Sequence, residues 1–274
     1  MPHFTASDGT SIYYTDEGTG LPVLALSGLT RNSTDFDFVA PYLTGYRLIR
    51  MDYRGRGKSD WCEDFSQYAV PVEARDAVEL LDHLGLDKAA ILGTSRGGLI
   101  GMFLAATAKD RLLGVALNDV GPQLDLAGLR IIADYVGRRP SWKTLDEAAE
   151  KRPATAPEFA NVPASRWREE VERLYVEKDD GLHLTYDPKL REAISGLDAD
   201  EQPDLWPLFD AMADLPIACI RGANSDLLSE DAFEEMKRRR PDMITVVVPD
   251  RGHIPFLDEP ESLEALNKWL DELR

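Results

Sequence analysis

The sequence predicts an α/β protein with a doubly wound, mostly parallel sheet, an N-terminal antiparallel hairpin and an inserted helical region. Short apolar runs alternate with helical patterns over residues 1–120 and again over residues 205–274. Such alternation is typical of parallel strands joined by right-handed helical crossovers. Residues 121–204 break the rhythm with helical patterns, prolines and charges. The 274 residues are enough for one large domain with an inserted subdomain.

The chain begins with a predicted hairpin, because two short runs flank the turn formed by Ser7, Asp8, Gly9 and Thr10. Pro22–Ser27 is a continuous apolar run, as expected for a strand that is buried on both faces. The other elements expected in this part are the hairpin strands His3–Ala6 and Ser11–Asp16, a helix at Ser33–Leu43 and a strand at Tyr46–Met51.

The next segment predicts an amphipathic helix at Pro71–Leu84, since its apolar residues fall on one stripe and Pro71 suits a first helical turn. Arg96–Ala108 is apolar almost all round, which predicts a buried helix. Strands are expected on either side of that helix, at Lys88–Gly93 and Leu112–Asn118.

Residues 121–204, here called the insertion, are expected to form an all-helical cap on a core made of residues 1–120 and 205–274. The helical patterns of the insertion lie at 126–136, 142–151, 164–177 and 188–194. After it, the sequence predicts strands at 217–221 and 243–248 and helices at 229–240 and 261–273.

Composition disfavours several classes of protein. A net charge of −18 repels phosphate backbones, so nucleic-acid binding is not expected. Cys62 and Cys219 are distant in sequence and give neither a metal spacing nor a disulfide framework. The N-terminus lacks the pattern of a secretion signal, and no apolar run approaches the roughly 20 residues that span a bilayer. The expectation is a cytoplasmic protein without membrane insertion.

The stretch Arg54–Ser59, RGRGKS, ends like a phosphate-binding loop. That motif needs a glycine five positions before Gly57, and the residue there is Asp52. A dinucleotide fingerprint in the other glycine cluster would need glycine at position 95, which is Ser95. Neither phosphate motif is therefore supported.

The segment Gly93–Gly97 reads G-x-S-x-G between a predicted strand and a buried helix. A serine at a sharp strand-to-helix turn has a strained backbone that projects its hydroxyl from the sheet edge, and small flanking residues let neighbouring backbone pass close by. Ser95 is therefore the candidate nucleophile. Of the four histidines, only His253 follows a strand at the same sheet edge, so it is the candidate base that activates the hydroxyl.

A third residue must hold His253 in one tautomer. Asp226 is expected in this role because it follows the preceding strand, and Asp119, after the strand Leu112–Asn118, is the alternative. The developing oxyanion needs backbone N–H donors. Arg96, the residue after the nucleophile, supplies one, and Leu29, in the loop after the first apolar strand, is expected to supply the other.

These segments together resemble the α/β-hydrolase superfamily, in its serine-hydrolase (esterase- and lipase-like) branch with a helical cap. The resemblance covers nearly the whole chain. It rests on S-G-L-T at 27–30, D-Y-R-G-R-G-K-S-D at 52–60, G-T-S-R-G-G at 93–98, R-G-A-N-S-D at 221–226 and G-H-I-P-F-L-D-E-P at 252–260. By resemblance, the 52–60 segment is a structural turn near the active-site edge, so Lys58 and Ser59 are not phosphate ligands.

Two departures from the family pattern matter. Ser27 stands where many relatives have histidine, and Arg96 stands where an apolar residue is frequent. The Arg96 side chain either binds an acidic substrate or pairs with a nearby carboxylate. We favour the ion pair, because buried charges are usually paired, with Asp119 as the best candidate. Thr30, Arg31 and Ile254 are expected to line the substrate pocket.

The resulting hypothesis is a serine hydrolase that cleaves a small-molecule carboxylic ester through an acyl-enzyme, without metal or organic cofactor. The serine nucleophile disfavours the epoxide and haloalkane hydrolases of this fold, which by resemblance use aspartate. Lactones, thioesters and carbon–carbon bonds flanked by carbonyls remain open as substrates. A hydrolase-like receptor that binds a ligand without turnover is the alternative from another class.

Overall fold

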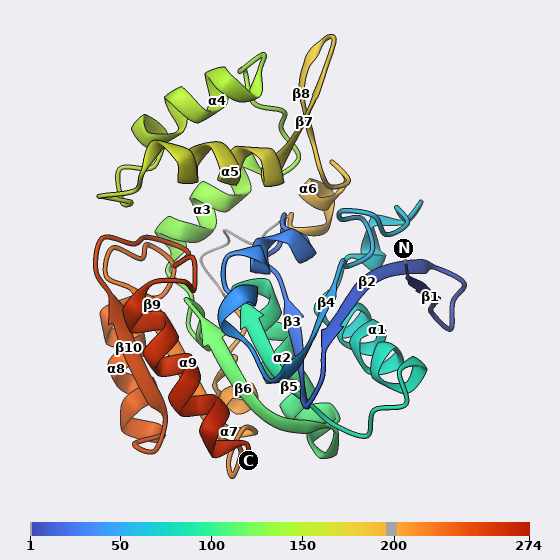
Figure 1. The fold of residues 1–274 in the computed structure, drawn as a ribbon, viewed down its shortest axis with the longest axis vertical. Helices are drawn as coiled ribbons and strands as arrows, with labels where there is room; N and C mark the ends of the chain where they lie inside the picture. Colours follow the sequence, from blue (N-terminus) through green and yellow to red (C-terminus); the bar gives the residue numbers. More distant parts are fainter. Residues whose placement is uncertain (1, 196–201) are drawn as a thin grey trace.

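The computed structural model describes residues 2–195 and 202–274, and it confirms the predicted fold class. An eight-stranded sheet has the order β1-β2-β4-β3-β5-β6-β9-β10. The first three of these strands pair antiparallel, and every later pair is parallel. The strands are β1 His3–Thr5, β2 Ser11–Gly18, β3 Leu21–Leu26, β4 Tyr46–Met51, β5 Ala89–Thr94, β6 Leu112–Asn118, β9 Ile217–Gly222 and β10 Ile244–Val248 (Figure 1).

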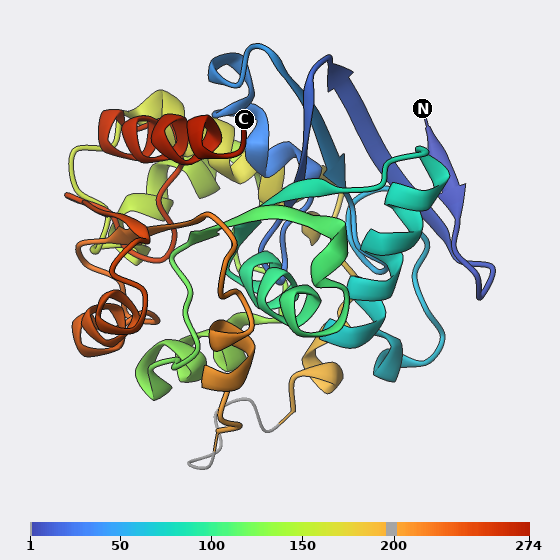
Figure 2. The ribbon, with the colours of Figure 1, turned by 90° about the horizontal axis from the view of Figure 1, so that it is seen from below.

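Helices cover both faces of this sheet (Figure 2). One face packs on α1 Val70–His83, α2 Arg96–Thr107 and α8 Glu230–Arg239, whose buried residues share one apolar cluster with the strands. The other face packs on α9 Pro260–Glu272 and on the short 3-10 helices Ser33–Asp37 and Ala40–Tyr42. The expected helix at 33–43 is therefore two 3-10 turns, and Pro41 at the second helical position explains the break.

The insertion follows β6, and its elements gather beyond one edge of the sheet (Figure 1). Its helices are α3 Leu126–Tyr135, α4 Leu145–Lys151, α5 Ala164–Leu174 and α6 Leu190–Ala193, and α7 Trp206–Asp210 leads back to β9. Residues 196–201 of the predicted insertion lie outside the described residues. The division into a core and a cap stays a prediction.

The insertion is not all-helical, which corrects one detail of the prediction. A hairpin of β7 Tyr175–Lys178 and β8 Gly181–Leu184 follows α5 directly. Helix α5 ends at Leu174 because the chain turns extended at Tyr175, and Gly181, with φ of 118°, lies at the hairpin turn. The charged sequence of residues 175–180 resembles a solvent-exposed helix face, so the sequence pattern did not predict the hairpin.

Two further findings concern features singled out in the sequence. Cys62 and Cys219 are both free, and Cys219 is buried in β9. Across residues 2–195 and 202–274, the helices are too short or too polar for a membrane span.

Candidate active site

Ser95 occupies the turn between β5 and α2 with a strained backbone. Its φ is 49° and its ψ is −110°, a conformation that is uncommon for a residue with a side chain. The N–H of Ser95 donates to the carbonyl oxygen of Asn118 at the end of β6, over 2.9 Å. The strained turn that the motif predicts is therefore present, and it is tied to the neighbouring strand.

The two glycines of the motif are needed for backbone packing. A Cβ at Gly97 would overlap the carbonyl oxygen of Leu26 in β3, and a Cβ at Gly93 would lie 2.5 Å from the carbonyl carbon of Gly97. The N–H of Gly97 also donates to Ser27 O over 3.1 Å. Helix α2 thus begins in direct backbone contact with the end of β3, which brings the loop after β3 next to Ser95.

Ser95, His253 and Asp119 form a chain of hydrogen bonds. His253 Nε2 lies 2.9 Å from Ser95 Oγ, and His253 Nδ1 lies 2.7 Å from Asp119 Oδ2. The Asp119 side chain is fully buried and also accepts hydrogen bonds from the N–H of Gly222 (2.8 Å) and the hydroxyl of Ser225 (2.6 Å). A buried, hydrogen-bonded carboxylate of this kind can hold the imidazole in one tautomer while its other nitrogen takes the serine proton.

The structure corrects the partner expected for His253, which is Asp119 rather than Asp226. Asp226 is half-buried, and burial raises the pKa of its carboxyl, although the nearby His253 opposes this rise. No hydrogen bond joins Asp226 to His253 among the described residues. The prediction failed because β6 and β9 are neighbours in the sheet, so Asp119 and Asp226 both follow strands that end beside His253.

The two backbone donors expected for an oxyanion lie close to Ser95 in the fold. Gly28, which precedes Leu29, is near enough that a Cβ there would lie 3.9 Å from Ser95 Cβ. Arg96 is the first residue of α2, where N–H groups have no partner within the helix. Within the described part of the chain, neither the Leu29 N–H nor the Arg96 N–H donates to a protein acceptor. The roles of these two groups stay proposals.

The Arg96 side chain is paired with a carboxylate, but not with Asp119 as expected. Its Nε donates to Oε2 of Glu73 in α1 over 2.7 Å, and its Nη2 donates to the carbonyl oxygen of Tyr68 over 3.1 Å. Glu73 is fully buried, and its other oxygen, Oε1, lies 2.7 Å from Nη1 of the fully buried Arg56. Burial would raise the pKa of the Glu73 carboxyl, but the two arginines outweigh burial and lower it.

Of the three residues expected to line a substrate pocket, Arg31 is held by carboxylates. Its Nη2 donates to Glu170 Oε1 of α5 over 2.5 Å, and its Nε lies 3.0 Å from Asp35 Oδ1. Burial raises the pKa of Asp35 to about 6, although Arg31 opposes this. Thr30 is buried and Ile254 is half-buried. Arg31 therefore joins the loop after β3 to the insertion, and a role for these residues in a pocket stays a prediction.

Other contacts place the insertion against the loops that carry His253 and Asp226. Asn161 Nδ2 donates to Asp250 Oδ2 over 2.7 Å, and Arg166 of α5 pairs with Asp258. Asn224 Nδ2 donates to the carbonyl oxygen of Glu158 over 2.8 Å. The insertion is thus fixed to the same edge of the sheet as Ser95, where it can limit access to the serine.

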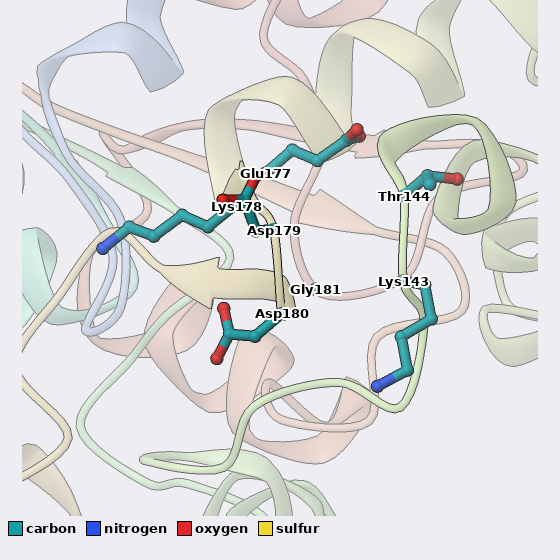
Figure 3. A pocket seen from close by; sticks show the side chains of 7 residues that line it. All are labelled: Lys143, Thr144, Glu177, Lys178, Asp179, Asp180 and Gly181. Atoms are coloured by element: carbon teal, nitrogen blue, oxygen red, sulfur yellow. The ribbon is translucent and has the colours of Figure 1, made fainter.

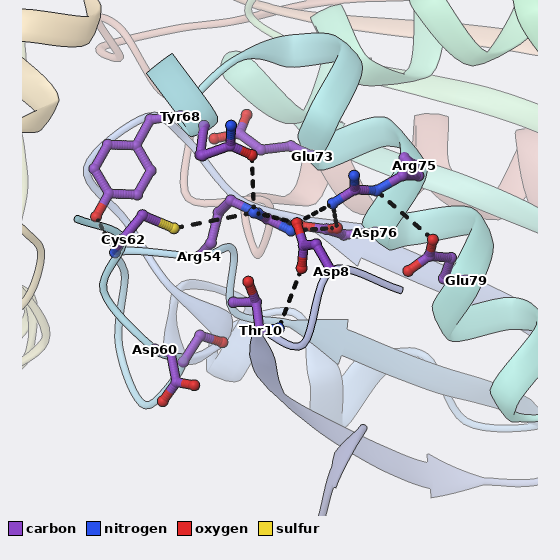
Figure 4. A network of polar contacts seen from close by, with 12 residues as sticks. Asp8, Thr10, Arg54, Asp60, Cys62, Tyr68, Glu73, Arg75, Asp76 and Glu79 are labelled. Atoms are coloured by element: carbon purple, nitrogen blue, oxygen red, sulfur yellow. Dashed lines mark hydrogen bonds and ion pairs between the residues drawn. The ribbon is translucent and has the colours of Figure 1, made fainter. Parts of the chain in front are cut away.

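The RGRGKS segment forms a turn beside this site rather than a phosphate loop, and four of its residues, Arg54, Gly55, Arg56 and Ser59, are buried. Arg54 binds both carboxylate oxygens of Asp76 in α1 over 2.7 Å and also contacts Asp8, as Figure 4 shows. Ser59 Oγ donates to Asp52 O over 2.7 Å. A Cβ at Gly57, where φ is 54°, would overlap the Asp52 carboxylate. These contacts agree with the structural turn that the resemblance implies.

A hollow of about 590 Å³ lies at the outer hairpin of the insertion (Figure 3). Charged side chains from the β7–β8 turn and from the residues before α4 line it, and Ser95, His253 and Asp119 do not. Three or more His, Cys, Asp or Glu residues in a metal-binding arrangement do not occur in the described ranges 2–195 and 202–274.

Comparison with known proteins identifies the family. The family model described as alpha/beta hydrolase fold matches residues 22–260. The chain therefore belongs to the α/β-hydrolase family, and it is a hydrolase.

Several relatives cover nearly the whole chain. A 3-hydroxybutyrate-oligomer hydrolase from Cupriavidus necator is 37% identical over 245 residues, which are 86% of this chain and 83% of that protein. The solved structure of an α/β hydrolase from Novosphingobium aromaticivorans is 36% identical, covers 99% of this chain and 97% of its own, and has a TM-score of 0.91. A 2-(acetamidomethylene)succinate hydrolase from Mesorhizobium japonicum is 27% identical over 93% of this chain and 90% of its own length.

Proposed function

We propose that this protein is a serine hydrolase that cleaves a carboxylic ester through an acyl-enzyme at Ser95. The observation that carries the proposal is the Ser95–His253–Asp119 chain, with separations of 2.9 Å and 2.7 Å. A serine hydroxyl is a weak nucleophile until a base takes its proton, and the short distance from Ser95 Oγ to His253 Nε2 supports His253 in that role.

In the proposed mechanism, Ser95 Oγ attacks the ester carbonyl and its proton moves to His253 Nε2. Asp119 stabilises the imidazolium, and the N–H groups of Leu29 and Arg96 bind the oxyanion. When the tetrahedral intermediate collapses, His253 protonates the leaving alcohol and Ser95 retains the acyl group. Water then adds to the acyl-enzyme by the reverse route, releasing the acid and restoring the Ser95 hydroxyl.

The preferred substrate class is an ester of a short hydroxy acid. Support comes from the relative that is 37% identical and is named a 3-hydroxybutyrate-oligomer hydrolase. Oligomers of a hydroxy acid are joined by ester bonds, so the proposed chemistry is sufficient to cleave them.

A substrate panel tests the proposal. It contains the dimer and trimer of 3-hydroxybutyrate, p-nitrophenyl esters of graded acyl length, a lactone and a thioester. We expect turnover of the hydroxybutyrate oligomers and short esters, and a fall in kcat of roughly 10³–10⁶ in Ser95→Ala, with the protein still folded. Turnover that persists in Ser95→Ala would contradict the nucleophile. Acylation by every substrate without release would favour the receptor that binds without turnover.

A further inference from the structure

The two proposed oxyanion donors are linked through one buried carboxylate, that of Glu73. Glu73 comes from α1, an element that contributes neither the nucleophile nor the base. Its Oε1 lies 2.7 Å from Arg56 Nη1, and its Oε2 accepts from Arg96 Nε over 2.7 Å. Glu73 and Arg56 are fully buried, and the Arg96 side chain is 14% exposed. Each oxygen of this carboxylate therefore holds a different arginine.

The first arginine, Arg56, holds the loop that carries Leu29. Its Nε donates to the carbonyl oxygen of Leu29 over 2.9 Å, and its Nη1 donates to the carbonyl oxygen of Arg54 over 2.7 Å. The N–H of Arg31 donates to the carbonyl oxygen of Gly28 over 3.1 Å. In a trans peptide the C=O and the N–H point in opposite directions, so the bond to Gly28 O also fixes the direction of the Leu29 N–H. Arg56 holds the other end of Leu29, its carbonyl oxygen.

The second arginine, Arg96, carries the other donor on its own backbone. Its side chain is held by Glu73 and by the carbonyl oxygen of Tyr68, over 2.7 Å and 3.1 Å. The next residue, Gly97, donates its N–H to Ser27 O in the loop after β3. The two donors thus lie on segments that are joined both directly, through Gly97, and through Glu73.

We infer that Glu73 is a positioning residue that sets the separation of the Leu29 and Arg96 N–H groups and so controls stabilisation of the oxyanion. This inference rests on the proposed function. Oxyanion donors act in the transition state, and removal of one donor in serine hydrolases lowers kcat by about 10²–10³. A substitution at Glu73 should therefore lower kcat and leave KM unchanged, which a purely structural ion pair would not do.

The chain offers a matched control on the same helix. Asp76 lies three residues after Glu73, is fully buried, and pairs with the 1%-exposed Arg54 over 2.7 Å (Figure 4). Arg54 and Arg56 come from the same loop, but the Arg54 side chain contacts Asp8, Cys62, Gln67 and Asp76, and none of these is a proposed donor. Asp76→Asn therefore breaks an equally buried ion pair without touching the proposed oxyanion site.

The experiment compares Glu73→Gln, Asp76→Asn and wild type by the rate at which a fluorophosphonate reacts with Ser95. In that reaction Ser95 Oγ bonds to phosphorus, fluoride leaves and the serine proton passes to His253, while the phosphoryl oxygen occupies the place of the oxyanion. Steady-state kcat and KM for p-nitrophenyl butyrate are measured on the same samples, and circular dichroism checks that each is folded.

We expect Glu73→Gln to slow phosphonylation and kcat by about 10²-fold with KM unchanged. Asp76→Asn should lose thermal stability but keep both rates near wild type. Equal rate losses in the two variants, or no loss in Glu73→Gln, would overturn the inference. If Glu73→Gln does not fold, Arg96→Met takes its place, since it removes only the contact between Glu73 and Arg96. This variant should slow phosphonylation about tenfold. A wild-type rate of phosphonylation in Arg96→Met would likewise overturn the inference. Wild-type protein that does not react at Ser95 would contradict the proposed function itself.

Discussion

Replacing Asp119 with asparagine should abolish most activity by changing the tautomer of His253. In the structure, Asp119 Oδ1 accepts from the Gly222 N–H over 2.8 Å, while Oδ2 accepts from Ser225 Oγ and His253 Nδ1. An asparagine that keeps the Gly222 contact through its oxygen turns its NH₂ group toward Nδ1 and donates to it. The ring proton then resides on Nε2, which cannot accept the Ser95 proton. We expect kcat to fall on the order of 10⁴-fold.

The fold should survive this change, because the Ser225 hydroxyl can rotate to accept from the new NH₂ group. The expected loss of stability is about 1–3 kcal/mol. The assay measures kcat for p-nitrophenyl butyrate and the midpoint of urea unfolding for Asp119→Asn and for Asp226→Asn. Asp226 lies close to His253 but is only half-buried, so Asp226→Asn is the matched control and should cost less than about tenfold in kcat. The reverse ranking would refute the assignment of Asp119.

Two further predictions concern packing and acid stability. Gly97→Ala should lower the free energy of unfolding by about 1–3 kcal/mol, because the new Cβ overlaps Leu26 O. Gly101→Ala in the same helix is the control and should lower it less, since a Cβ there meets only side chains, 3.0 Å or more away. The opposite ranking in urea unfolding would contradict the close backbone contact at Gly97. The lowered pKa of Glu73 means that its contribution to stability is present above its ordinary value of 4.5 and is lost as the pH falls through the lowered value. Wild type should therefore lose stability more steeply than Glu73→Gln below pH 4.5 in urea unfolding, and parallel curves would contradict this.

The contact between Ser95 and His253 was predictable from the sequence because the signals of both residues are local. Ser95 sits in a five-residue motif between a strand and a helix, and His253 was the histidine that followed a strand at the right edge. The partner of His253 was not predictable in this way. Asp119 and Asp226 follow adjacent strands, and the choice depends on loop geometry, such as the φ of 54° at Asp119, that residue spacing does not encode.

The partner of the Arg96 side chain was missed for a different reason. Glutamate is almost never fully buried unless it is paired, so composition gave no reason to place Glu73 inside. A signal was present, since Glu73 lies beside the apolar stripe of α1 at Ala74 and Ala77 rather than on its exposed face. The neighbouring loop also carries two arginines, Arg54 and Arg56, which equal in number the acidic residues Glu73 and Asp76 of that helix. Only the tertiary structure shows which arginine pairs with which acid.

The central claim, that Ser95 is the nucleophile of a hydrolase, is tested most directly by titration with a fluorophosphonate followed by peptide mass spectrometry. Loss of esterase activity should be proportional to the adduct formed, reach completion at about one adduct per chain, and map to the peptide that contains Ser95. An adduct on any other residue, or full modification of Ser95 with activity retained, would contradict the account.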